Sequence, residues 1–565
     1  MLNRSMLLLP LAASLAAPAQ ALACGGFFCS SVPMDQSKER IIFAIDESEG
    51  SVETHVQIFY EGAAAEFAWI VPVPAVPELG LSIDALFQAL DSTTQPWFWL
   101  EQRFVGDCQL FYPPMAADGA EEDASTGGGG VTVIAETQVG PYDTVTLQAT
   151  SEVELLNWLQ ANAYVIPDAV GAHLAPYVAE ASYFIALKLS NNRDAGDIAP
   201  IKFTYQASAA MIPLVLTAIA ATPDMRLQPY VFADARAVPD NYLHVQINEA
   251  AIDWLGNGSN YDAVITQAAN EAGGQAFATD FSGPTDTMRG MLWAEGRFDL
   301  DLLRSTDDPA TFVSHMLSMG FPRSPQVQNL IRTFIPMPES AIEDGLDEAS
   351  FYNCLDCYPE YLAEIDFAPV AFANTLDEVI VTPLEEAEAL FWDHPVVTRM
   401  TSSMSPDEMT SDPQFILNPD MGPVSNQHSA TLVIDCTEDA EDPASWVTWI
   451  ELQDGTQILL PPGAGAGIWS GGTGVDEALS SVAASSVEDT TGSGPPTTVT
   501  DNAAQIADAV ASHNAAIEAQ YDDAGIPLPD GVRTTAGGCG CDTNGRPGWA
   551  FGAMLGLLAA RRRRT

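Results

Sequence analysis

Near the start of the chain, an apolar run at residues 40–45 is followed by residues 52–60, where hydrophobic and polar positions largely alternate as in a half-buried strand. The acidic segment 46–51 between them supplies a turn. A third apolar run, residues 67–71, ends at Pro72. The opening of the chain therefore predicts a β-hairpin followed by a further strand.

Later segments mix strands with helices. Gly140 and Pro141 separate two strand-like segments, 131–136 and 143–149, and so predict a second hairpin. Ser151 and Glu154 form a capping box that opens a helix reaching about residue 164. The same reading predicts strands at 183–189, 201–205 and 242–247, and helices at 261–272, 310–319 and 326–334. We predict an α+β fold, strand-rich in its N-terminal half with intercalated helices, and not a regular doubly wound sheet.

Four segments follow from changes in composition. Residues 1–23 resemble a secretory signal peptide, with Arg4 before an apolar stretch and Ala21-Leu22-Ala23 as the cleavage site. Residues 24–436 are expected to be one module of unknown function, the largest part of an exported body that reaches residue 538. Residues 437–538 are expected to be a small extension that holds a Gly/Ser/Thr/Pro-rich linker (463–500) and a helical stalk (501–522). Residues 539–565 are a C-terminal sorting or anchor segment.

The C-terminal segment has three parts in a fixed order. Cys539 and Cys541 lie in a glycine-rich motif, residues 549–560 are uncharged and apolar, and four arginines (561–564) follow. This arrangement resembles the myxobacterial C-terminal sorting signal. The resemblance implies cleavage near Cys539 by a sorting protease of the membrane, attachment of a membrane lipid there, and display of the body on the cell surface.

The alternative is an uncut anchor in the form of a transmembrane helix. Twelve apolar residues span about 18 Å as a helix, which is short for a hydrocarbon core of about 30 Å. In either case the arginines would stay on the cytoplasmic side and the body would lie outside.

The charge of the chain is strongly negative. Its 565 residues include 21 Lys and Arg against 76 Asp and Glu, a formal net charge of −55. Nucleic-acid binding through a basic face is thereby excluded, because neutralising phosphates needs a cationic surface. We interpret the acidity as a solvated exterior suited to a saline medium. Two alternatives are a basic macromolecular partner and Ca²⁺ binding in one oxygen-rich loop, with the candidate ligands Asp253, Asn257, Asn260 and Asp262.

Eight cysteines suit an oxidising compartment. Cys539 and Cys541 belong to the tail, which leaves Cys24, Cys29, Cys108, Cys354, Cys357 and Cys436 as disulfide candidates. Six cysteines allow about 15 pairings. Local spacing favours Cys24–Cys29 and Cys354–Cys357, and so leaves Cys108 with Cys436. The Cys354-Leu355-Asp356-Cys357 motif also fits a redox dithiol or half of a zinc site, and Cys24 is a minor candidate for lipidation.

Several motifs together resemble one bacterial exported family, the domain of unknown function 2330. They are residues 23–29 (ACGGFFC), 67–74 (FAWIVPVP), 271–279 (EAGGQAFAT), 354–357 (CLDC), 398–400 (TRM) and 406–413 (PDEMTSDP). The resemblance covers roughly residues 24–436. It implies one continuous module and brings no activity, substrate or catalytic residue with it.

Recognisable catalytic signatures are missing from the sequence. It contains no Gly-x-Ser-x-Gly elbow, no His-Glu-x-x-His motif and no phosphate-binding loop. His394 beside Asp393 is the best acid–base candidate. Trp97-Phe98-Trp99 could stack on sugar rings, although burial in the core is commoner for aromatic residues.

We therefore predict an exported, surface-anchored, non-enzymatic binding or envelope module with no cofactor. The alternative is an extracytoplasmic enzyme, either a hydrolase or a thiol oxidoreductase that uses Cys354 and Cys357.

Overall fold

The structure is a computed structural model that describes ten segments of the chain. These are residues 38–57, 69–108, 135–162, 170–189, 199–219, 221–438, 442–464, 477–492, 494–529 and 531–532. The expected signal peptide, Cys24, Cys29 and the C-terminal segment with Cys539 and Cys541 lie outside these residues.

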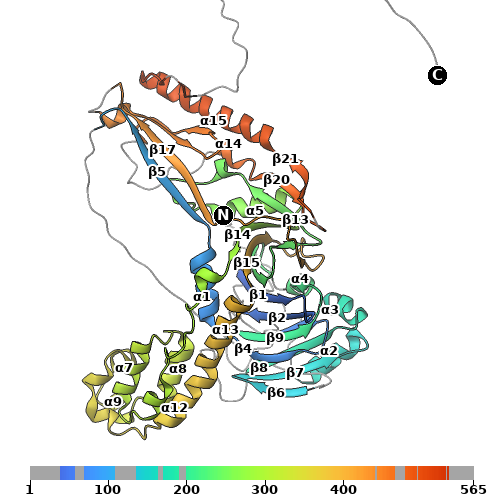
Figure 1. Cartoon of the computed structure of the whole chain (residues 1–565), viewed down its shortest axis with the longest axis vertical. Coiled ribbons are helices and arrows are strands. Elements are labelled where there is room, and N and C mark those ends of the chain that lie inside the picture. Colours follow the sequence, from blue (N-terminus) through green and yellow to red (C-terminus); the bar gives the residue numbers. More distant parts are fainter. Residues whose placement is uncertain are drawn as a thin grey trace, which may run out of the picture.

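A mixed ten-stranded sheet forms the centre of the molecule (Figure 1). Most neighbouring strands are antiparallel, but β1 pairs with β11 and β13 with β14 in parallel. In spatial order the strands are β21 (Thr497–Asp501), β20 (Ala484–Asp489), β13 (Leu243–Ile247), β14 (Ala276–Pro284), β15 (Val396–Met404), β11 (Met225–Ala233), β1 (Lys38–Asp46), β2 (Ser51–Val56), β9 (Ile201–Gln206) and β4 (Glu78–Leu81).

Three smaller sheets complete the β-structure of the described chain. The first contains β3 (Trp69–Val73), β8 (Tyr183–Leu189), β7 (Tyr142–Gln148) and β6 (Ala135–Val139). The second contains β10 (Ala210–Met211), β16 (Gln414–Leu417) and β12 (Ala237–Pro239). The third, here called the upper sheet, contains β19 (Gln457–Leu459), β18 (Val447–Glu451), β17 (Gln427–Asp435) and β5 (Trp97–Val105).

A helical lobe is inserted between β14 and β15, which pair with each other in the central sheet (Figure 1). Its helices are α6 (Leu300–Arg304), α7 (Pro309–Met319), α8 (Pro325–Phe334), α9 (Glu339–Glu343), α10 (Glu348–Asn353), α11 (Pro359–Leu362), α12 (Pro369–Leu376) and α13 (Thr382–Asp393). The other helices are α1 (Asp84–Thr94), α2 (Glu152–Ala161), α3 (Val170–Ala179), α4 (Leu214–Thr217), α5 (Tyr261–Glu271), α14 (Glu477–Ser480) and α15 (Ala503–Ala524).

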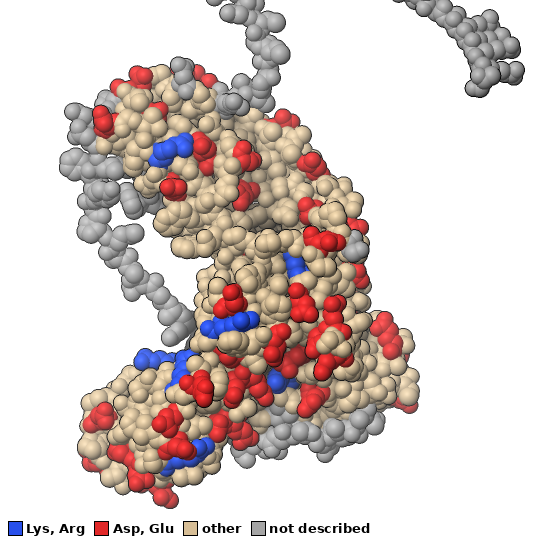
Figure 2. Space-filling model, viewed as in Figure 1, with Lys and Arg blue, Asp and Glu red and all other residues tan. Residues whose placement is uncertain are grey.

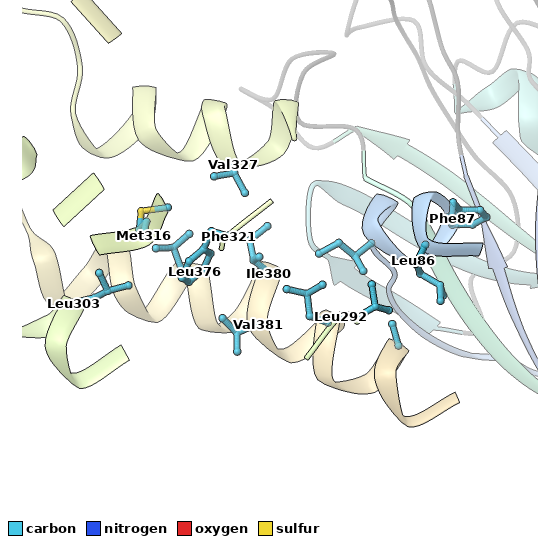
Figure 3. Close-up of a cluster of buried hydrophobic side chains, with 14 of the residues drawn as sticks. Leu86, Phe87, Leu292, Leu303, Met316, Phe321, Val327, Leu376, Ile380 and Val381 are labelled. Atoms are coloured by element: carbon cyan, nitrogen blue, oxygen red, sulfur yellow. The ribbon is translucent and has the colours of Figure 1, made fainter. Parts of the chain in front are cut away.

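The helical lobe shares its core with one face of the central sheet. Ile42, Tyr230 and Phe232 from that sheet belong to the same buried cluster as Phe312 and Phe372 from the lobe. Figure 3 shows this cluster running from the lobe, past Leu292, to Leu86 and Phe87 of α1. The lobe is therefore packed onto the sheet as well as being connected to it.

The fold class predicted from the sequence is confirmed: helices and several mixed sheets make an α+β structure. The two predicted hairpins are present as β1–β2 and β6–β7. Half of the predicted capping box is present: the Ser151 side chain accepts a hydrogen bond of 3.2 Å from the backbone N–H of Glu154, while the Glu154 carboxylate accepts from the Thr150 hydroxyl. The predicted helices near 261, 310 and 326 correspond to α5, α7 and α8.

The segment expected as a linker differs from its prediction. Residues 484–489 and 497–501 form β20 and β21, and β20 pairs with β13 of the central sheet. Ala484 and Val487 are buried although this stretch has few large apolar residues. The physical reason is non-local: the carboxylate of Glu271 accepts hydrogen bonds from the backbone N–H groups of residues 483 and 484 and fixes the strand in place.

The expected stalk is also packed against the body. Helix α15 buries Val510, Ile517 and Tyr521 against the strands of the upper sheet and its surroundings. Within the described residues, no helix combines the length and apolarity that crossing a membrane requires.

Candidate functional site

Two tryptophans stand exposed on one face of β5. Side chains alternate along a strand, so Trp97 and Trp99 point to one face and Phe98 to the other. Trp97 and Trp99 are 57% and 56% exposed, whereas Phe98 is 4% exposed. The two indole rings lie 5.9 Å apart between centroids at an interplanar angle of 77°, so they form a corner. Exposure of two adjacent large aromatic rings is costly for a soluble protein and marks a candidate binding surface.

Phe98 anchors this strand in the core. Its ring lies 5.5 Å from those of Trp254 and Tyr261, and it stacks on the His428 ring at 4.7 Å. Gly258 makes room for the ring: a Cβ at that position would lie 2.2 Å from Phe98 Cδ2, and the backbone there has φ +76°. The residues around Phe98 therefore fix the position of the two exposed tryptophans.

The loop expected to bind Ca²⁺ is the loop that holds Phe98. The Asp253 carboxylate accepts hydrogen bonds from the backbone N–H of Gly256 and from the Ser259 hydroxyl, both at 3.0 Å. Asn260 Oδ1 accepts from the backbone N–H of Asp253 at 2.7 Å.

The other two candidate ligands have different surroundings. Asn257 adopts a left-handed conformation with φ +52°, and Asp262 forms an ion pair with Arg226. In the described chain, no group of three or more His, Cys, Asp or Glu side chains is arranged to hold a metal ion. The oxygen-rich composition of this loop serves its own turns, since Asp and Asn readily hydrogen-bond nearby backbone.

Planar polar side chains surround the tryptophan corner. Strand register places Ser429 of β17 directly beside Trp99, and Gln453 donates a hydrogen bond of 2.8 Å to the Ser429 hydroxyl. Four residues beyond Trp99 on the same face, Arg103 donates to Glu451 at 2.9 Å, and this hydrogen bond holds the pKa of Glu451 below its ordinary value. We call the surface made by Trp97, Trp99, Ser429, Gln453 and the Arg103–Glu451 pair the tryptophan face.

Helix α15 covers another part of the sheet face on which Trp97 and Trp99 lie. It covers Val433, Trp449 and Leu459, which occupy the same face of the sheet as Trp97 and Trp99. The turn 452–457 lines a groove of about 690 Å³, together with residues that include Asn248, Glu249, Ser485 and Asn514. The tryptophan face is thus the open part of a sheet face that is otherwise covered.

Three histidines are hydrogen-bonded to carboxylates. His55 contacts Ser82 Oγ at 2.7 Å and Glu53 at 2.9 Å, and His244 contacts Thr279 Oγ1 at 3.0 Å and Glu488 at 3.2 Å. Both imidazoles are about 1% exposed. Although a hydroxyl, an imidazole and a carboxylate in sequence are typical of acid–base chemistry, such a chain needs an accessible reacting site. We interpret both as buried structural chains.

The acid–base candidate His394 does not form a comparable chain. Burial lowers the pKa of His394, and the charge of Asp393 opposes that shift. Its ring lies 6.3 Å from that of Phe232, and its backbone carbonyl accepts from the Thr285 hydroxyl. In the described part of the chain its imidazole makes no hydrogen bond to a carboxylate. The third pair, His428 with Glu249 at 2.9 Å, supports Phe98 instead.

Two disulfides are present among the described cysteines. Cys108 is bonded to Cys436 with a Cα–Cα distance of 5.6 Å, and Cys354 to Cys357 with 5.3 Å. The first joins the ends of β5 and β17, and so braces the strand that carries the tryptophans. The second lies in a 3₁₀ turn between α10 and α11 rather than at a helix start after a buried strand, the usual setting of a redox pair.

Sequence reasoning had found Trp97-Phe98-Trp99 but not its surroundings. The sequence carries two signals of a half-exposed strand. The aromatic residues at positions 97–99 alternate between the two faces of the strand, and the charged residues Glu101 and Arg103 lie on the same face as the tryptophans. The partners on β17 and β18 come from more than 300 residues further along the chain and carry no local signal.

Comparison with known proteins supports the family resemblance. Residues 18–291 match the profile of the domain of unknown function 2330, described as an uncharacterised protein conserved in bacteria. The match ends shortly after β14, so the extension of one module to Cys436 stays a prediction. No curated protein and no solved structure matches this chain.

Proposed function

We propose that this protein is an exported, surface-anchored binding module that holds neutral polysaccharide on its tryptophan face. The observation that carries the proposal is the pair of exposed rings, Trp97 and Trp99, fixed by a buried anchor between them. Aromatic faces stack on the apolar faces of sugar rings, and planar amides, carboxylates and guanidinium groups bind sugar hydroxyls. Gln453 supplies such a group next to Ser429, the register neighbour of Trp99, and Glu451 and Arg103 supply others further along the same sheet face.

Charge favours a neutral ligand over an acidic one. The chain carries a formal net charge of −55, and acidic side chains are scattered over the molecular surface (Figure 2). Such a field repels polyanions at ordinary ionic strength. Polysaccharides without carboxylate or sulfate groups approach the tryptophan face without that penalty.

The location of the protein is part of the same proposal. The first 23 residues would direct export, and the C-terminal segment would be cut near Cys539 and joined to a membrane lipid, which would place the body on the cell surface. The acidity and the even number of body cysteines are consistent with an oxidising exterior. Mass spectrometry of both mature termini, with fractionation of the cells, tests this part; an uncut chain in the cytosol would overturn it.

Affinity electrophoresis tests the binding proposal. The mature protein is run through gels that contain neutral glucans, mannans or xylans, with polygalacturonate as the acidic comparison. At least one neutral polymer should retard the protein, and the double variant Trp97→Ala/Trp99→Ala should lose that retardation. Each ring contributes about 1 kcal/mol, so the loss is about thirtyfold in affinity.

A matched control is available in Trp392, which is 60% exposed on α13 in the helical lobe. The Trp392→Ala variant should bind as the wild type does. If no neutral polymer retards the protein, or if retardation survives the double substitution, the proposal is wrong.

A further inference from the structure

The two edges of the upper sheet are treated differently. On the β19 edge, Asn514 of α15 takes the place of a missing strand: its Oδ1 accepts from the backbone N–H of Leu459 at 2.9 Å and its Nδ2 donates to the carbonyl of Gln457 at 2.7 Å. His513 adds a contact of 2.8 Å to the carbonyl of Leu459. The opposite edge of the upper sheet is β5, a strand of nine residues at the outer margin of that sheet (Figure 1).

Within the described chain, β5 pairs with β17 and with no strand on its other side. The N–H of Trp97 donates to Asn426 and the carbonyl of Val105 accepts from Cys436, so odd-numbered residues direct their backbone groups toward β17. Backbone groups alternate in direction along a strand. The even-numbered residues, Phe98 to Phe104, therefore direct theirs toward the open edge, where a strand could pair.

The sequence of this edge is complementary to itself. If a second β5 lies antiparallel with its twofold axis at Gln102, Leu100 of one copy meets Phe104 of the other, and Gln102 meets its counterpart. These are even-numbered positions, as hydrogen bonding on this edge requires. On the tryptophan face, Glu101 then lies opposite Arg103 of the other copy, and the converse pair forms as well.

Neighbouring registers are less favourable. A twofold axis at Glu101 would also pair even-numbered residues, but it would set the two Glu101 carboxylates directly opposite each other. Like charges in that position destabilise a strand pair, whereas opposite charges stabilise it. Backbone direction and charge thus select the same register.

We propose that the open edge of β5 is a dimer interface, and that its occupant is the β5 strand of a second copy of this chain, antiparallel about Gln102. The pairing joins two upper sheets into one continuous sheet. Both tryptophan corners lie on the same face of that sheet, because opposed residues in an antiparallel pair point the same way. The argument rests on the backbone and charges of β5, and it stands whether or not the tryptophan face binds polysaccharide.

Ionic strength should affect this dimer in an unusual direction. Each copy carries a formal charge of −55, so long-range repulsion opposes association at low salt. Screening removes that repulsion over distances beyond about 8 Å at 0.15 M, while the closely apposed Glu101–Arg103 pairs are screened less. The dimer should therefore strengthen as salt rises from a few millimolar to the physiological range.

Sedimentation velocity on the mature protein across micromolar concentrations tests the proposal. The wild type should dimerise at 0.15 M salt. Glu101→Arg and Arg103→Glu should each weaken the dimer at least about tenfold, because each sets like charges opposite each other twice. The double reversal Glu101→Arg/Arg103→Glu should restore it, although the Arg103–Glu451 contact within each copy is lost.

Two controls keep the outcome unambiguous. Glu47→Arg makes the same charge change in the exposed β1–β2 turn and should leave the dimer unchanged. Gln102→Pro removes an N–H from the open edge but none from the β17 ladder, and should give a monomer with a native circular dichroism spectrum. A wild type that is monomeric throughout, or a dimer indifferent to Glu101→Arg and Gln102→Pro, would overturn the proposal.

Discussion

Gly258 makes room for the Phe98 side chain, which fixes the position of the tryptophan face. Replacing Gly258 by alanine should therefore lower the free energy of unfolding, by an amount that follows from the structure. The backbone at Gly258 has φ +76°, and an added Cβ would lie 2.2 Å from Cδ2 and 2.7 Å from Cγ of Phe98. Alanine in a left-handed conformation costs about 1–2 kcal/mol. The clash with a buried ring that is held by Trp254 and His428 adds about 1–3 kcal/mol, the range found for overpacked cores.

Gly273 separates these two contributions. It has φ +88°, yet nothing lies within 4 Å of the position its Cβ would take. Gly273→Ala should therefore show the backbone cost alone. Urea denaturation of both variants should place Gly258→Ala about 1–3 kcal/mol below Gly273→Ala in free energy of unfolding.

Phe98→Leu completes the test, because a smaller side chain should relieve the clash. In the Gly258→Ala background, the loss in free energy of unfolding caused by Phe98→Leu should be at least about 1 kcal/mol smaller than in the wild type. If Gly258→Ala is no more destabilising than Gly273→Ala, or if the two substitutions at 98 and 258 are additive, Phe98 is not held as we describe.

Four further predictions concern stability. Burial alone would raise the pKa of Glu53, but the hydrogen bond and charge of His55, with the charge of Lys202, lower it to about 2. Glu53 should therefore stabilise the fold above about pH 4.5 and lose that effect as the pH falls toward 2; Glu53→Gln should cost about 3 kcal/mol at pH 7 and almost nothing at pH 2, as measured by urea denaturation. Burial raises the pKa of Asp412 to about 6, so its contribution has the opposite sign: stability should fall as the pH rises from about 4 to 6, and Asp412→Asn should remove this slope from the pH profile. Asn514→Ala leaves a buried N–H and a carbonyl of β19 without their partner and should lower the free energy of unfolding by about 2–4 kcal/mol, whereas an equal stability would show that water replaces the amide. Replacing both Cys108 and Cys436 by alanine opens a loop with a sequence separation of 328 and should lower the free energy of unfolding by about 6 kcal/mol, against about 2 kcal/mol for the pair Cys354 and Cys357. Thermal denaturation that ranks the two pairs in the reverse order would contradict the loop-entropy argument.

Local patterns predicted the elements whose signals are contained in a few neighbouring residues. The β1–β2 hairpin follows from two apolar strand patterns around an acidic turn, and the start of α2 from the N-cap residue Ser151, whose side chain accepts from the backbone N–H of Glu154. By contrast, residues 484–489 and 497–501 form strands β20 and β21, and Glu271, more than 200 residues earlier in the chain, binds the backbone where β20 begins. Composition alone made that stretch look like a linker, since its apolar side chains are small.

The candidate site shows the same contrast between features encoded by neighbouring residues and features that depend on distant ones. Trp97, Phe98 and Trp99 were visible as a motif, but the expectation that aromatic residues are buried holds only for the middle one. Edge strands violate that expectation on their open face, and a sequence does not say which strand will be an edge. Of the four calcium candidates, Asp253 and Asn260 accept hydrogen bonds from the loop's own backbone, and Asp262 pairs with Arg226.

The insertion of the helical lobe between β14 and β15 bears on the order in which the molecule assembles. Pro284 and Val396 are register neighbours in the central sheet, yet the whole lobe lies between them in the chain. Closing so long a loop costs entropy that is recovered only when its ends are brought together by compaction of the helices. The middle of the sheet should thus be among the last parts to form, after the helices of the lobe have collapsed.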